Sequence, residues 1–231
     1  NAGRMVRDIN LELYEGEIVG IAGLMGAGRT ETTRAIFGID PKESGEIFID
    51  GKEVKISCPA DSIKAGLVLA PEDRKKDGLC TRLSIADILC EGPVGTVNRK
   101  KEKAMVDNAV KALKIKLPNA QVDAGSLSGG NQQKVVVAKW LARNSRVVIF
   151  DEPTRGIDVA AKVEIYNLMN QLKQNGIGVM FVSSEMPEVM GMSDRIIVMC
   201  DGRITGELSA EEATQDMILT KATQFEQKTA L

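Results

Sequence analysis

Histidine is absent from the 231 residues of this chain, and its absence excludes two classes of site. Neither a catalytic triad that depends on histidine nor a metal centre with histidine ligands can be built. The four cysteines are scattered, and no two of them form a C-x-x-C pair. This spacing favours free thiols in a reducing compartment over disulfides or a metal site.

Long hydrophobic runs are also lacking. No uninterrupted apolar run is long enough to cross a bilayer, and no secretory signal is visible, so any membrane role is expected to be peripheral. The net charge of −2 gives no electrostatic reason to expect nucleic acid. The basic start of a predicted helix at Arg99-Lys100-Lys101 is therefore interpreted as a solvated helix face.

The strongest local pattern is the segment Gly23–Thr30, which has the glycine spacing of a phosphate-binding P-loop. The apolar run Ile18–Ala22 predicts a strand before it, and Glu31–Phe37 predicts a helix after it. Glycines let backbone N–H groups fold around a pyrophosphate, and the helix start adds unpaired N–H groups. The Thr30 hydroxyl is expected to reach Mg²⁺, whereas Arg29 departs from the usual lysine.

Two other interpretations of this segment exist. It could be a glycine turn that simply precedes a helix. It could also be a dinucleotide-binding turn, but Glu31 stands where the third glycine of G-x-G-x-x-G belongs.

A second pattern is the apolar strand Val147–Phe150, which ends in Asp151 and Glu152. In P-loop enzymes an aspartate at this place holds the Mg²⁺ whose other protein ligand is the P-loop threonine. Glu152 is then placed to orient or deprotonate an attacking water. A strand that ends in an ordinary polar turn is the alternative.

The stretch Leu127–Gln133 is the most specific one. Ser128, two glycines and a helix start predict a second anion cradle, built from the Ser128 hydroxyl, the Gly130 N–H and the helix dipole. One phosphate chain hardly needs two cradles from one chain, so this cradle is expected to serve a nucleotide held by another domain. A plain helix entry is the alternative.

Alternating apolar strands and amphipathic helices predict a mostly parallel, covered sheet. Strands are expected at Val6–Leu13 and Ile177–Val182, and a mobile polar tail after Leu219. Asp158 should cap a helix with an apolar stripe at Val159, Val163, Tyr166, Met169 and Leu172. The predicted division is a core with an antiparallel β subdomain (1–78 and 141–220), a helical subdomain (79–140) and a tail (221–231).

Together the P-loop, the Leu127–Gln133 signature and the acidic strand end resemble the nucleotide-binding domain of ATP-binding cassette (ABC) transporters. They occur in that family's order over nearly the whole chain. Within the family, the chain is most similar to the second, C-terminal cassette of bacterial ribose/galactose-type monosaccharide importers. The segments Gly23–Glu31, Pro71–Lys75 and Ser183–Val189 carry this narrower match.

The resemblance implies the fold class, the ligands and the site residues. The fold is a P-loop α/β core with an antiparallel β subdomain and an inserted helical subdomain. ATP and Mg²⁺ are the implied cofactors. The implied residues are Gly23, Gly26, Ala27, Gly28, Arg29, Thr30 and Glu31 for ATP; Thr30 and Asp151 for the metal; Glu152 for catalysis; Ser128, Gly129, Gly130 and Gln132 for the signature in trans; Glu72 for the Q-loop; Asp158 for the D-loop; and Ser184 for the switch position.

Three of these positions depart from the family's pattern. Glu72 replaces the usual glutamine, Ser184 replaces the histidine that contacts the γ-phosphate, and Arg29 replaces the lysine. The aromatic that stacks on adenine is expected upstream of this chain, which suggests half of a tandem protein. The chain's own phosphate site is therefore expected to be altered, while its signature is complete.

The partners that the resemblance implies are a second cassette, membrane permease subunits and, indirectly, a sugar-binding protein. The second cassette is an N-terminal one on the same polypeptide or a second copy of this chain, and each nucleotide lies between one P-loop and the opposite signature. The expected location is the cytoplasmic face of the plasma membrane. The Glu72–Gly78 loop, with Arg74 and Lys75, is expected to contact the permease. A mainly non-catalytic, signature-donating half and a soluble ABC protein outside transport are the alternatives.

Overall fold

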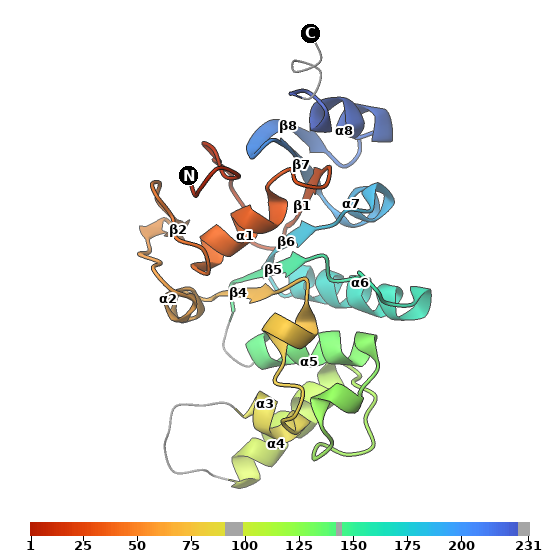
Figure 1. Cartoon of the computed structure of the whole chain (residues 1–231). Coiled ribbons are helices and arrows are strands. Elements are labelled where there is room, and N and C mark those ends of the chain that lie inside the picture. The colour runs from red at the N-terminus through yellow and green to blue at the C-terminus, as the bar shows by residue number, and fades with distance from the viewer. Residues whose placement is uncertain (91–98, 142–144, 226–231) are drawn as a thin grey trace. The chain divides into compact units, whose positions relative to one another are not determined.

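The structure is a computed structural model that describes residues 1–90, 99–141 and 145–225 (Figure 1). It divides into two compact units. The first comprises Asn1–Leu69, Arg146–Glu152 and Met169–Leu231, and the second comprises Ala70–Ser145 and Pro153–Leu168.

A six-stranded sheet in the order β4-β5-β6-β1-β7-β8 organises the first unit. Its strands are β1 (Ile18–Gly23), β4 (Leu67–Ala70), β5 (Val147–Asp151), β6 (Gly178–Val182), β7 (Arg195–Cys200) and β8 (Arg203–Ser209). The central strands β5, β6, β1 and β7 run parallel, and β8 returns antiparallel to β7. These parallel strands are almost continuously buried, as expected for a sheet covered on both faces.

Helices cover the two faces of this sheet. The helices of the first unit are α1 (Arg29–Phe37), α2 (Pro59–Lys64), α7 (Met186–Met192), α8 (Gln215–Ala222) and the end of α6 (Val159–Gln174). Neighbouring residues of a strand point to opposite faces. Ile21 of β1 packs in one apolar cluster with Phe37 of α1, whereas Ala22 packs in another with Val189 of α7. The helices α1 and α7 therefore lie on opposite sides of β1, as Figure 1 shows.

A short hairpin completes the first unit. It joins β2 (Phe48–Ile49) and β3 (Lys52–Glu53) through Asp50 and Gly51, whose φ angles are 52° and 70°. Two successive positive φ angles are those of a type I′ turn, which matches the twist of paired strands. Asp-Gly is one of the residue pairs that such a turn favours.

The second unit is mainly helical. It contains the π-helical turn η1 (Arg74–Gly78), α3 (Ile85–Leu89), α4 (Arg99–Ala112), the 3-10 turn η2 (Ala124–Ser126), α5 (Gly129–Leu141) and the start of α6. The Ser84 hydroxyl accepts a hydrogen bond from the Asp87 N–H at 3.1 Å and so caps α3. Helix α3 packs against α4 and α5, and its Ile85 and Ile88 are buried.

The predicted P-loop α/β fold class is confirmed, but three local expectations are wrong. Val6–Leu13 does not form the expected strand: Val6 makes only an isolated bridge with Ala2, and the positive φ of Asp8, 53°, interrupts extended backbone. Val159 and Val163 are 78% and 49% exposed, so the buried stripe of α6 does not include them. The chain after Leu219 continues as helix to Ala222; the rest of the expected tail, 226–231, lies outside the described residues.

Candidate functional site

The P-loop joins β1 to α1 in the first unit. Gly26 and Gly28 have φ angles of 81° and 93°, which only glycine adopts without strain. A Cβ atom on Gly28 would also overlap the carbonyl oxygen of Met5. Gly28 is the N-cap of α1 and offers no side-chain acceptor, so the N–H groups of the first turn remain available to an anion.

Asp151 lies at the end of β5 and accepts hydrogen bonds from two hydroxyls of α1. The Thr30 Oγ1 is 3.1 Å from Asp151 Oδ1, and the Thr33 Oγ1 is 3.4 Å from Asp151 Oδ2. Asp151 is only 2% exposed, and this burial raises its pKa to about 6. A threonine hydroxyl beside a carboxylate is oxygen chemistry that suits Mg²⁺, and the structure places Thr30 next to Asp151, as the expected metal site requires.

Thr33 was not among the residues expected at this site. It lies three residues after Thr30, on the same face of α1. That spacing was the signal in the sequence that could have identified it. Its buried hydroxyl donates to the Thr30 carbonyl oxygen at 2.9 Å and also lies 3.4 Å from the second oxygen of Asp151.

The guanidinium of Arg29 contacts other protein groups, so its charge is already paired. Its Nη1 donates to the carbonyl oxygen of Ser183 at 2.6 Å, and its Nη2 lies 3.6 Å from Glu152 Oε1. Both members of this ion pair are buried, with side chains 9% and 10% exposed. Burial lowers the pKa of Arg29, although the nearby carboxylates oppose this shift. Guanidinium stays protonated in proteins, so the pair is ionic.

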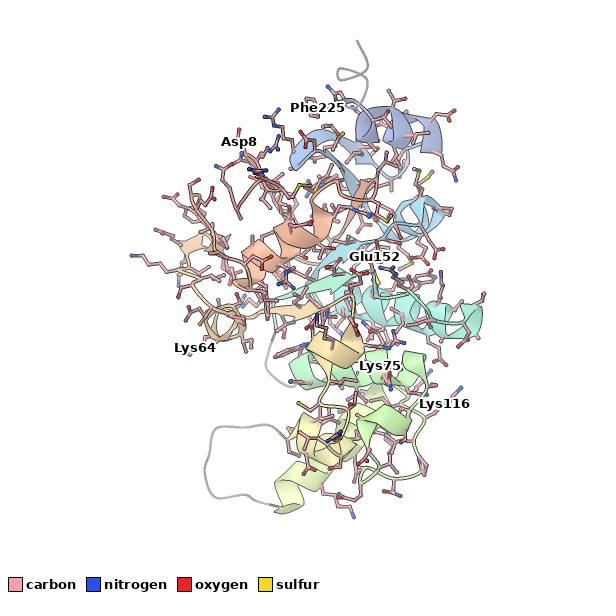
Figure 2. All side chains as sticks on the ribbon, in the orientation of Figure 1. Asp8, Lys64, Lys75, Lys116, Glu152 and Phe225 are labelled. Carbon is pink, nitrogen blue, oxygen red and sulfur yellow. The ribbon has the colours of Figure 1, made fainter. Side chains whose placement is uncertain are left out.

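Glu152, which Figure 2 labels, is the first residue after β5. It has a φ of 47°, in the left-handed region. Non-glycine residues in this conformation are strained and cluster at functional sites. Its Oε2 accepts a hydrogen bond from Ser184 Oγ at 3.1 Å. The structure thus brings together five expected site residues in the first unit: Arg29, Thr30, Asp151, Glu152 and Ser184.

The other P-loop residues frame this cluster. Glu31 is half-buried in the first turn of α1, and Ala27 is buried. A Cβ atom on Gly23 would lie 2.6 Å from the Met199 carbonyl oxygen and 2.9 Å from the Ala27 Cβ, so the loop approaches neighbouring backbone closely there. Only glycine fits at that point.

The signature residues belong to the second unit. Helix α5 begins at Gly129, and the exposed Ser128 accepts a hydrogen bond from the Asn131 side-chain amide at 2.9 Å. Gly130 is buried against α6, where an added Cβ would lie 2.7 Å from the Ala161 Cβ. Gln132 is 1% exposed and its amide donates to the Ala124 carbonyl oxygen at 3.2 Å. The exposed part of the cradle is therefore Ser128 and the helix start.

Glu72 and Asp158 also lie in the second unit. Glu72 forms an ion pair with Arg155. Asp158 caps α6, because its Oδ1 accepts a hydrogen bond from the Ala161 N–H at 3.0 Å. The cap expected at Asp158 is confirmed.

Arg74 lies on the turn for which the sequence suggested a permease contact. It is half-buried and its Nε donates to Gln132 Oε1 at 3.3 Å, whereas Lys75 and Lys76 on the same turn are exposed; Lys75 is labelled in Figure 2. The permease contact of this loop stays a prediction.

A glycine loop between a buried parallel strand and a helix, beside a threonine–aspartate pair, defines a P-loop nucleotide-binding protein. The chain belongs to the ABC transporter family, whose pattern matches residues 6–155. The fold agrees. The structure of cbiO1 from Clostridium perfringens, part of the ABC transporter complex cbiONQ, superposes with a TM-score of 0.78 at 22% identity, covering 98% of this chain and 90% of that one.

Two relatives are much closer in sequence. The ribose import ATP-binding protein RbsA of Oceanobacillus iheyensis is 51% identical over 222 residues, and the xylose import ATP-binding protein XylG of Moorella thermoacetica is 48% identical over 227. These alignments cover 94% and 95% of this chain but 45% of each relative. The chain thus spans less than half the length of these relatives.

None of the helices in the described part of the chain combines the length and apolar character that a membrane-spanning helix needs.

Proposed function

We propose that this chain is an ATP-binding cassette that powers import of a ribose-type monosaccharide through a membrane permease. The observation that carries the proposal is the Thr30–Asp151 pair, at 3.1 Å, beside the P-loop. The names of the similar proteins, which describe ribose and xylose import, support the substrate class. The chain would work at the cytoplasmic face of the plasma membrane without crossing it.

ATP and Mg²⁺ are the proposed cofactors, and the residues present fit them. The first-turn N–H groups of α1 would bind phosphate oxygens, and Thr30 and Asp151 would hold Mg²⁺. When bound, the metal neutralises charge on the phosphates. Glu152 would orient the attacking water, with Ser184 fixing one carboxylate oxygen at 3.1 Å.

This half is proposed to be the weaker catalyst of a pair of cassettes. Arg29 is bound to the Ser183 carbonyl oxygen and lies beside Glu152, so its charge is partly neutralised before any phosphate arrives. Hydrolysis at the chain's own site would require Glu152 to leave this pair. The complete signature would instead act in trans, with Ser128 and the start of α5 contacting the nucleotide on the P-loop of a partner.

The partner is proposed to be a second cassette on the same polypeptide or a second copy of this chain. The length of the RbsA relative outside the 45% that matches is sufficient for another cassette. Permease subunits would contact the Glu72–Gly78 loop through Lys75 and Lys76, and a sugar-binding protein would act on the outer side. A non-catalytic, signature-donating half and a soluble ABC protein outside transport are the competing functions.

Uptake by the intact transporter tests the proposal. The full polypeptide would be reconstituted with its permease and sugar-binding protein in liposomes, and entry of labelled ribose, xylose and galactose measured with and without ATP. We expect uptake of at least one of these sugars only with ATP, and reduced uptake in Thr30→Val together with Asp151→Asn, because these changes weaken nucleotide binding at the chain's own site. Failure of the polypeptide to associate with any permease would favour the soluble alternative.

A further inference from the structure

The side chain of Arg74 joins three segments of the second unit that the signature depends on. These segments are the loop that contains Arg74, the start of α5, and the residues that lead into α6. Its Nε donates to Gln132 Oε1 at 3.3 Å, and its Nη1 lies 3.5 Å from the Arg155 carbonyl oxygen. All three residues belong to the same compact unit.

The guanidinium also lies against the backbone of the signature. A Cβ atom on Gly129 would come within 2.5 Å of Arg74 Nη2 and 3.3 Å of Arg74 Cζ. Gly129 is the first residue of α5 and follows Ser128 directly. Arg74 therefore packs on the residue that orients the signature serine.

Gln132 extends this contact to the other side of the signature. It is 1% exposed, and its Nε2 donates to the carbonyl oxygens of Ala124 and Gly125 at 3.2 and 3.4 Å. Its Oε1 accepts from Arg74. A buried amide whose donor and acceptor are both satisfied holds its neighbours in one arrangement, so the Ala124–Gly125 turn and Arg74 are fixed through one side chain.

The direction of Arg74 is set by its own loop. Asp73 Oδ1 accepts hydrogen bonds from the N–H groups of Lys75 and Lys76 at 3.0 and 3.1 Å, which closes the π-helical turn η1. At the end of this turn, an added Cβ on Gly78 would lie 3.2 Å from the Val136 Cγ2 of α5. The turn is thus packed on α5, which directs Arg74 toward the helix start.

We propose that Arg74 is a positioning residue for the signature. It holds Ser128, Gly129 and Gln132 in the arrangement that a partner's nucleotide needs. The inference rests on the proposed function, in which the signature acts in trans. A planar fork is required, because one guanidinium contacts Gln132, Gly129 and the Arg155 carbonyl oxygen together.

The test uses the intact transporter in liposomes, with Arg74→Ala, Arg74→Lys and the control Arg82→Ala. Arg82 is an exposed arginine of the same unit. Two quantities are measured: amide hydrogen exchange of residues 124–133, and the ATP dependence of ATPase turnover. A second comparison combines Arg74→Ala with Gln132→Ala.

We expect Arg74→Ala to speed exchange at 124–133 and to reduce kcat/KM for ATP by up to about 100-fold, since a small misplacement of a site can cost that much. Arg74→Lys should recover only part of this, because it keeps the charge without the fork. Arg82→Ala should change neither quantity. The double variant should be less damaging than the sum of the two single variants, because the Arg74–Gln132 contact is lost in each of them.

Unchanged exchange at 124–133 in Arg74→Ala would overturn the inference while leaving the proposed function intact. So would full recovery by Arg74→Lys, because charge alone would then suffice. Faster exchange with unchanged turnover would instead show that the signature's arrangement does not matter for hydrolysis. That outcome would overturn both the inference and the trans role of the signature.

Discussion

At the scale of single residues, Asp151 and Glu152 are two buried carboxylates with few partners that could offset their charge. Asp151 relies on two hydroxyls, and Glu152 on Arg29 and Ser184. Burying a carboxylate that no cation directly pairs costs free energy, which is why the pKa of Asp151 rises. Such a site is prepared for a cation, since Mg²⁺ would supply the missing charge.

The raised pKa of Asp151 predicts a pH dependence of stability in the absence of metal. The folded-state pKa of about 6 lies above the ordinary 3.8, so the folded chain takes up the proton at a higher pH than the unfolded chain. Protonation of Asp151 therefore adds on the order of 3 kcal/mol to the free energy of unfolding. This stabilisation is fully present below about pH 4 and is lost as the pH rises through 6. Mg-nucleotide affinity should change oppositely and weaken as pH falls below 6.

Urea unfolding of the metal-free chain between pH 4 and 7 measures this effect. Asp151→Asn should lack the pH-dependent contribution of Asp151 to stability. The difference in the free energy of unfolding between this variant and the parent chain should therefore vary with pH. Asp216→Asn, at an exposed position in α8, serves as the control. Parallel stability curves for the parent chain and Asp151→Asn would contradict the account.

The residue pattern predicted the Thr30–Asp151 pairing well but not the direction of Arg29. Spacing fixes which residues end strands and start helices, and parallel strand ends meet at one edge of a sheet. It does not fix rotamers. Arg29 pairs with Glu152 and Ser183 because these groups follow neighbouring strands, which is a tertiary fact that a one-dimensional pattern does not contain.

At the scale of elements, the best predicted features are those with local causes. The cap at Asp158 and the strands β1 and β6 follow from a few adjacent residues. Helix α6 was predicted less well, because the 3.6-residue period permits more than one apolar face. Tertiary packing buries Ile165 and Leu168 and leaves Val159 exposed.

The packing of α5 on α6 in the second unit gives a second prediction. Gly130 and Ala161 meet so closely that Gly130→Ala should destabilise the chain by about 1–3 kcal/mol through overpacking. In an Ala161→Gly background the same change should become neutral or stabilising, because alanine is favoured over glycine in a helix by about 1 kcal/mol. Denaturant unfolding of the four chains checks this, and an equal effect in both backgrounds would refute the contact.

At the scale of the whole molecule, the proposed function divides the two tasks of a cassette unequally between the chain's own phosphate site and its signature. The site in the first unit keeps Thr30, Asp151 and Glu152 but has Arg29 bound to protein groups. The signature in the second unit is complete and ordered by Asn131, Gln132 and Arg74. The chain is thus expected to contribute more to a partner's nucleotide than to its own.

The isolated chain should therefore bind Mg-ATP weakly and hydrolyse it far below the usual enzyme range of about 1–10³ per second. Arg29→Lys should tighten binding several-fold, because an ammonium on a flexible stem can leave Glu152 for a phosphate. Arg34→Lys, on the same helix, is the matched control. Calorimetric titration gives the affinity for Mg-ATP, and a phosphate-release assay gives the rate of hydrolysis. Turnover within the usual enzyme range would contradict the prediction.

The most direct test of the central claim compares Ser128→Arg with Glu152→Gln in the intact transporter. Sugar uptake and ATPase rate are measured for both variants at matched expression. A bulky cation at the exposed Ser128 should block the cradle that serves the partner's nucleotide and abolish both activities. Glu152→Gln, which affects only the chain's own altered site, should be tolerated better. If Glu152→Gln is as damaging as Ser128→Arg, the chain's own site is catalytically necessary and the unequal division is wrong.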